Sequence, residues 1–197
     1  MDCSERAAAL EATHAQVRVC PLCALCKSRT NAVPGEGSID ADVMFVGEAP
    51  GSEEDRQGRP FVGASGKLLT RLLGDIGIDR GDVFITSLVK CRPPRNRDPF
   101  PHEIAACRPY LLTQMDIIRP KVVCALGRHA ARSLMDKRIA ISRDHGQERQ
   151  IGDMAYVALY HPAAALHRAG MMGELEGDMR ALRTLLSRIG MGRARKR

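Results

Sequence analysis

Four short apolar runs, separated by stretches of helical periodicity, restrict most strongly what this chain can fold into. Each run is at most seven residues long, is rich in β-branched side chains, and is bounded by Gly, Pro or charged residues. Runs of this kind are typical of strands that are buried on both faces of a parallel sheet. They occupy residues 42–47, 83–89, 121–127 and 155–161.

Apolar residues between and after these runs recur at helical spacing. Amphipathic helices are predicted at the N-terminus and in three later segments, residues 68–76, 104–118 and 175–189. Alternating strands and helices favour an α/β fold with one parallel sheet of about four strands. The chain has 197 residues, which fits a single domain spanning residues 1–197.

Composition excludes several classes of protein. Lys and Arg outnumber Asp and Glu by 30 to 23, for a net charge of +7, and apolar residues make up 44%, enough for a packed core. No segment approaches the ~18 unbroken apolar residues of a membrane span, and the N-terminus lacks a secretory signal. We therefore expect a cytoplasmic protein without a membrane partner. Residues 188–197 form a basic tail, either a solvated terminus or an arm for nucleic acid.

Polar segments follow the apolar runs, where parallel strands would end and ligands bind. The first, residues 47–67, contains five glycines, whose spacing matches neither a Walker loop nor a dinucleotide-binding fingerprint. Its carboxylates are suited to steering water or a developing cation. Phe61, in this segment, provides either a stacking surface for a flat ligand such as a base or an anchor in a local core.

Basic residues follow the second run, around two adjacent prolines. The pattern is typical of an edge that contacts phosphates, and an ordinary solvated loop is the alternative. The net positive charge favours nucleic acid as the partner. The basic residues are Lys90, Arg92, Arg95 and Arg97.

A histidine follows the fourth run. His161 is a candidate hydrogen-bond donor or acid at the end of a strand, although a lone histidine is more often structural. In the small-residue stretch after it, Leu166 is a candidate wedge between stacked bases and Arg168 a candidate phosphate contact.

Seven cysteines in a cytoplasmic chain are buried apolar residues or metal ligands. Two residues separate Cys20 from Cys23 and two separate Cys23 from Cys26, and Cys91 and Cys107 lie further along the chain. Two local and two distant thiolates fit either zinc or an iron–sulfur cluster. Cys26 is an alternative ligand to Cys20 or Cys23, and Cys107 is alternatively a core residue. We expect Cys124 to be packed in a strand and Cys3 to be exposed.

Taken together, these segments closely resemble the family 4 uracil-DNA glycosylases, an iron–sulfur-containing bacterial and archaeal group. The resemblance covers nearly the whole chain. It implies a three-layer α/β/α domain with a four-stranded parallel central sheet, and a [4Fe-4S] cluster held by Cys20, Cys23, Cys91 and Cys107. The matching segments are residues 47–51, Glu54-Asp55, residues 58–63, Leu68-Leu69, residues 89–97, Leu126-Gly127 and His161-Pro162.

The resemblance also implies a DNA-repair reaction in which uracil is flipped out of the stack and its N-glycosidic bond is hydrolysed. Phe61 would stack on the base, and backbone amides of the Gly47–Gly51 turn, including Ala49, would bind its edge. His161 is expected to donate to a uracil carbonyl. Glu48 is expected to position water or stabilise the sugar cation, with Glu54 and Asp55 as alternatives.

Ser87 departs from the pattern, because the family usually has Asn there. The Asn amide makes paired hydrogen bonds to uracil, whereas Ser offers one hydroxyl. The alternatives are therefore a non-catalytic iron–sulfur protein that binds DNA lesions or abasic sites, or a glycosylase for hypoxanthine or xanthine. We expect a monomer whose partner is uracil-containing DNA, single- or double-stranded, contacted by Arg92, Arg95, Arg97, Leu166 and Arg168.

Overall fold

The computed structural model describes residues 2–190, and within them six strands form one mixed sheet in the order β1-β3-β2-β4-β6-β5. The four central strands are parallel to one another, and each lies within one of the predicted apolar runs or overlaps it almost completely. The parallel core of the sheet is thus as predicted. Its strands are β3 (Phe84–Ser87), β2 (Val43–Gly47), β4 (Val122–Leu126) and β6 (Met154–Leu159).

The expectation of a four-stranded parallel sheet is wrong at both edges. Strand β1 (Glu36–Gly37) pairs antiparallel with β3, and β5 (Glu148–Ile151) pairs antiparallel with β6. Neither has the apolar run by which the central strands are recognised, because β1 has two residues and β5 is a largely exposed Glu-Arg-Gln-Ile segment. Edge strands need not be apolar on both faces.

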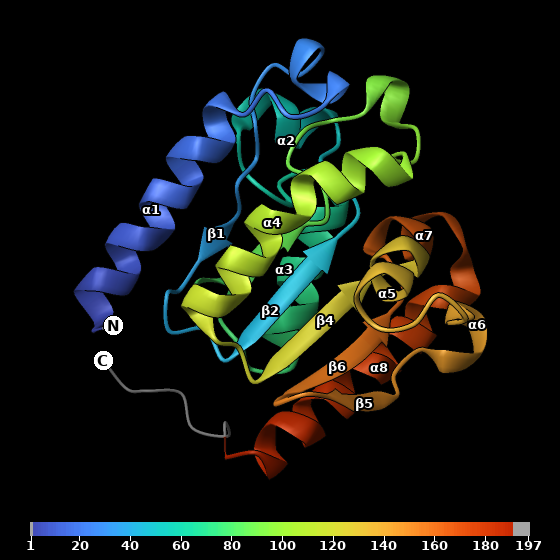
Figure 1. The fold of residues 1–197 in the computed structure, drawn as a ribbon. Helices are drawn as coiled ribbons and strands as arrows, with labels where there is room; N and C mark the ends of the chain where they lie inside the picture. The colour runs from blue at the N-terminus through green and yellow to red at the C-terminus, as the bar shows by residue number, and fades with distance from the viewer. Residues whose placement is uncertain (1, 191–197) are drawn as a thin grey trace.

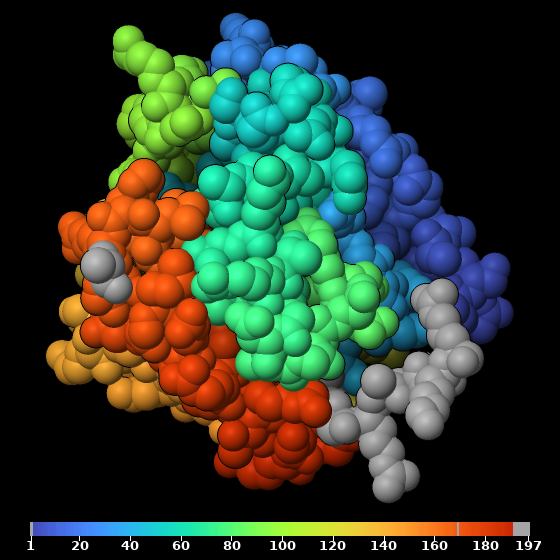
Figure 2. All heavy atoms as spheres, turned by 180° about the vertical axis from the view of Figure 1, so that it is seen from behind, coloured from blue at the N-terminus to red at the C-terminus, as the bar shows by residue number. Residues whose placement is uncertain are grey.

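Helices cover both faces of the sheet. On one face Met44 packs with Leu111, and on the other Phe45 packs with Leu72 and Leu182. Helices α1 and α4 lie on the first face, and α3 and α8 lie on the second (Figures 1 and 2). The α-helices are α1 (Cys3–Val19), α2 (Ser52–Gln57), α3 (Ala64–Asp75), α4 (Pro101–Ile118), α5 (Arg128–Leu134), α6 (Ile141–Asp144), α7 (Pro162–His167) and α8 (Ala169–Arg188).

The loops that follow the parallel strands lie together at the carboxyl ends of these strands, called the carboxyl edge of the sheet below. Residues distant in sequence can therefore meet there. Residues 2–190 also contain three single-turn 3₁₀ helices, η1 (Ala24–Lys27), η2 (Arg80–Asp82) and η3 (Pro94–Asn96). No helix in the described part of the chain is long and apolar enough to cross a membrane. In the basic tail, Arg188 pairs with Glu148, and Arg193, Arg195, Lys196 and Arg197 lie outside the described residues.

Candidate active site and metal centre

Phe61 and His161 face each other at the carboxyl edge of the sheet. Their ring centroids are 5.6 Å apart and the planes are tilted by 32°. The Phe61 ring lies against Gly47, where a Cβ atom would come within 2.7 Å of the ring and 3.3 Å of the Ser87 hydroxyl. Phe61 is 8% exposed and also packs in the core. The structure therefore brings four of the predicted site residues together. It confirms Phe61 as an anchor in the core, and the stacking role of Phe61 stays a prediction.

The loop that carries Phe61 is fastened to α2 by Glu54. One carboxylate oxygen of Glu54 accepts hydrogen bonds from the backbone amides of Val62 and Gly63, each at 2.9 Å, and the other accepts from Gly51 at 3.1 Å. These bonds help to hold Phe61 at a φ of 50°, a conformation that L-residues rarely adopt. The Glu54 carboxylate is thus engaged in positioning the Phe61 loop.

Asp55 is buried and connects α2 to the chain after the cysteine segment. Its carboxylate accepts from the amide of Thr30 at 2.9 Å, and its carbonyl accepts from the side chain of Asn31 at 2.8 Å. Asp55 and Glu54 were both expected as alternatives to Glu48 in catalysis. The structure places each of them in hydrogen bonds with backbone amides.

His161 is the N-terminal cap of α7, and its Nδ1 accepts a hydrogen bond from the amide of Ala163 at 3.1 Å. Burial lowers the pKa of His161 to about 4, against an opposing effect of Glu54. The ring is therefore neutral at physiological pH. Because Nδ1 is an acceptor, the proton of the neutral ring is on Nε2, which leaves Nε2–H to donate.

Two histidines with a lowered pKa, His14 and His161, predict a pH-dependent stability. Burial lowers the pKa of both His14 and His161 to about 4, below the ~6.5 of a histidine in an unfolded chain. Between those values the unfolded chain binds more protons, so the free energy of unfolding falls as pH is lowered through this window. Urea unfolding at several pH values would measure the fall. His14→Gln should make it shallower, and an unaltered slope would contradict this assignment.

Glu48 is half-buried at the end of β2, and burial is the main cause that raises its pKa. Asp98 raises this pKa further, whereas His129 and Arg128 lower it. Sequence reasoning assigned no role to Asp98 or His129. His129 could have been found from its position in the sequence, because Gly127-Arg128-His129 directly follows the third predicted parallel strand. The neighbouring Ala49 packs with the cysteines, not with Phe61.

Five cysteines line one hollow beside this site, together with Tyr110 and Lys90. The thiol of Cys91 accepts a hydrogen bond from the Arg29 guanidinium at 3.1 Å, and that of Cys107 accepts from the amide of Lys90 at 3.3 Å. Donors of this kind stabilise thiolates that bind a metal. The all-sulfur set therefore fits a metal or an iron–sulfur cluster. The five are Cys20, Cys23, Cys26, Cys91 and Cys107.

The other two cysteines lie outside this hollow, as predicted. Cys124 is completely buried in β4, and Cys3 is exposed. Cys107 is also buried, and this burial raises the pKa of its thiol to about 11. A metal ion would be needed to hold it as a thiolate at neutral pH.

The loop after β3 is less available to phosphates than its charge suggested. Lys90 is 1% exposed, so its expected place on a phosphate-contacting edge is wrong. Its ammonium donates to the carbonyl of Ser87 at 2.9 Å and to the side chain of Gln114 at 2.8 Å. Buried polar partners satisfy it. The sequence shows the charge of Lys90 but not the direction of its side chain.

Arginines of the same loop differ in their partners. Arg97 makes two hydrogen bonds to the buried Glu103, at 2.7 and 2.8 Å, and lies over the ring of Phe100. Arg92 donates to Asn96 at 2.7 Å. Arg95 is exposed, as are Leu166 and Arg168 at the end of α7. These three exposed residues are accessible to a macromolecule at this edge.

A mixed α/β sheet with four parallel central strands has an aromatic–histidine pair at the carboxyl ends of those strands and a cysteine hollow beside the pair. Together these features define a class of protein. The model of the Uracil DNA glycosylase superfamily matches residues 34–182 of the chain.

The curated relatives narrow the class further. A type-4 uracil-DNA glycosylase of Sulfurisphaera tokodaii is 47% identical over 185 residues, covering 89% of this chain and 84% of the relative. That of Saccharolobus solfataricus is 49% identical over 181 residues, covering 87% and 84%. That of Archaeoglobus fulgidus is 47% identical, covering 85% and 88%. The chain therefore belongs to the type-4 uracil-DNA glycosylases.

Proposed function

We propose that this protein hydrolyses the N-glycosidic bond of uracil in DNA and leaves an abasic site. The observation that carries the proposal is the Phe61–His161 pair, with ring centroids 5.6 Å apart beside Gly47. A planar base flipped from the stack needs an aromatic surface and hydrogen-bond donors at its edge. Family membership agrees with this function.

In the proposed mechanism one set of residues stabilises the departing uracil, and Glu48 acts on the sugar and the attacking water. Phe61 stacks on the base, the Gly47–Ala49 backbone and Ser87 bind its edge, and Nε2–H of His161 donates to a carbonyl oxygen that becomes anionic. Donors aimed at developing charge lower the barrier most when they are already in place. Glu48 positions the water and stabilises the positive charge on the sugar.

Glu54 and Asp55 act indirectly in this proposal, because their carboxylates bind backbone amides. Glu54 holds the Phe61 loop, and Asp55 joins α2 to the chain after the cysteine segment. We assign contacts with the DNA backbone to Arg92, Arg95 and Arg168, and a wedge role to Leu166. Arg97 holds the loop through Glu103. We expect the protein to work as a monomer on single- or double-stranded DNA.

We assign the cysteine hollow to a [4Fe-4S] cluster held by Cys20, Cys23, Cys91 and Cys107. Four thiolates around one zinc ion would be ~3.8 Å apart, given Zn–S bonds of ~2.3 Å. Among the described residues, no three cysteine sulfurs lie within 4.8 Å of one another, which suits a larger group. When bound, the cluster would supply a structural tie between residues 20–26 and 91–107.

The experiment that tests the function is release of free uracil from a uracil-containing oligonucleotide, single- and double-stranded, with enzyme in excess. We expect release from at least one of the two and a product that alkali cleaves at the abasic site. Oligonucleotides with hypoxanthine and xanthine define the base range. No release of uracil from either substrate would contradict the proposal.

Base selectivity should respond to Ser87→Asn. One hydroxyl at this position makes fewer hydrogen bonds to the base edge than an amide does. A side chain that makes two hydrogen bonds to a base contributes ~1–3 kcal/mol of discrimination against other bases. We expect Ser87→Asn to raise the single-turnover rate on uracil about tenfold or more. Ser87→Ala is the matched control and should lower the rate. If Ser87→Asn lowers the rate as much as Ser87→Ala does, the assigned place of Ser87 at the base edge is wrong.

A further inference from the structure

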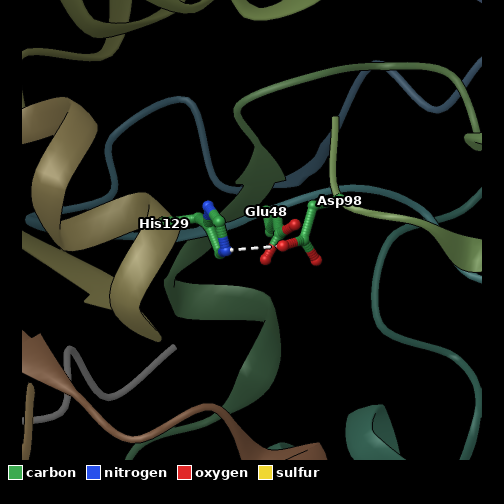
Figure 3. A group of neighbouring side chains, drawn as sticks. All are labelled: Glu48, Asp98 and His129. Carbon is green, nitrogen blue, oxygen red and sulfur yellow. Dashed lines mark ion pairs between the residues drawn. The ribbon is translucent and has the colours of Figure 1, made fainter. Parts of the chain in front are cut away.

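Three side chains from separate segments meet beside the proposed uracil site. Glu48 follows β2, Asp98 follows η3, and His129 lies in the first turn of α5 (Figure 3). One nitrogen or oxygen atom from each lies within 4.8 Å of the other two. The ion pair drawn in Figure 3 joins His129 Nε2 to Asp98 Oδ2 at 3.0 Å.

The donor atoms of this trio are those of a transition-metal site, but a fourth side chain argues against a metal ion. The Arg128 guanidinium lies 2.9 Å from Nε2 of His129, the atom that a metal would need, and 3.8 Å from Asp98. Arg128 thus already supplies positive charge at this place. Because a guanidinium only donates and a carboxylate only accepts, Nε2 of His129 accepts from Arg128 when it carries no proton and donates to Asp98 when it carries one. The arrangement of Glu48, Asp98 and His129 is better explained by charge interactions among these side chains and Arg128.

The charges around Glu48 oppose one another. Burial and the neighbouring Asp98 raise the pKa of Glu48, whereas His129 and Arg128 lower it. Among residues 2–190, these are the charged groups that act on the pKa of Glu48. Two carboxylates this close disfavour ionisation of both, unless cations lie beside them. Arg128, which is always charged, and His129 when it is protonated therefore favour the ionised form of Glu48.

We propose that His129, held by Asp98, is a positioning residue that keeps Glu48 ionised for excision. The inference rests on the role proposed for Glu48. It accounts for a histidine and an aspartate at this edge, which the reaction does not otherwise use. It also links the loop after β3, expected to contact DNA, to the residue that positions water.

The test is the single-turnover excision rate of His129→Gln as a function of pH, from about pH 4.5 to 9. The glutamine amide can donate a hydrogen bond to Asp98 but cannot be protonated. Since an opposite charge within ~4–6 Å shifts a pKa by ~1–3 units, we expect the acidic limb to move to higher pH by about one unit. The rate should then fall about tenfold at pH 5 and differ from the wild-type rate by less than about twofold at pH 8. His129→Arg, which is always charged, should restore the wild-type limb.

Two controls separate this inference from the roles on which it rests. His102→Gln changes an exposed histidine in α4 and should leave the profile unaltered. Glu48→Gln should remove most activity at every pH, and if it is fully active, the role of Glu48 is wrong. If Glu48→Gln is inactive while His129→Gln keeps the wild-type limb, or His129→Arg shifts it equally, the role of His129 is wrong.

Discussion

His161→Ala is expected to lower the single-turnover rate of uracil excision by about two to three orders of magnitude, the effect of removing one well-placed donor to a developing oxyanion. The physical reason is the preorganisation of the ring. Its Nδ1 is fixed by the amide of Ala163, and burial holds the pKa near 4, so Nε2–H is ready to donate throughout the neutral range.

Affinity for DNA containing an abasic site should change little in His161→Ala, because the lost bond forms with the departing base. His14→Gln is the matched control. Burial lowers the pKa of His14 to about 4 as well, but this residue lies in α1, so its replacement should alter the rate by less than a few-fold. A His161→Ala enzyme as fast as the wild type would contradict the proposed donor.

Cys91→Ala and Cys107→Ala are each expected to abolish the brown colour of an iron–sulfur protein, with its broad absorbance near ~400 nm, and to destabilise the fold. Loss of a structural metal group belongs to the few changes that cost more than ~4 kcal/mol. For a chain of this size we expect the Tm to fall by about 10 °C or more. DNA affinity should fall with it, because Cys91 adjoins the basic loop.

Cys26→Ala is the matched control for the cluster, since Cys26 lines the same hollow but has no assigned bond. It should keep the colour, the Tm and the DNA affinity. A colourless wild-type protein with one equivalent of zinc would contradict the cluster. If Cys107→Ala keeps the colour and Cys26→Ala loses it, Cys26 and not Cys107 is the cluster ligand.

The parallel core was predictable because strands buried on both faces must be apolar along their whole length. Strand β5 was not, because its Glu-Arg-Gln-Ile segment is exposed at an edge and has no such pattern. The convergence of Phe61 and His161 followed from the position of both segments after strands. The burial of Lys90 and the contact of Asp98 with His129 could not be predicted in this way. They depend on side-chain direction and on the path of a loop, which local sequence does not specify.

The central claim is that flipped uracil lies against Phe61 within reach of His161. A crystal structure of the protein with free uracil tests it most directly. We predict that the uracil ring stacks on Phe61, with Nε2 of His161 at a hydrogen-bonding distance of ~2.7–3.2 Å from a carbonyl oxygen. Uracil bound away from Phe61, or with His161 turned from its oxygens, would contradict the account.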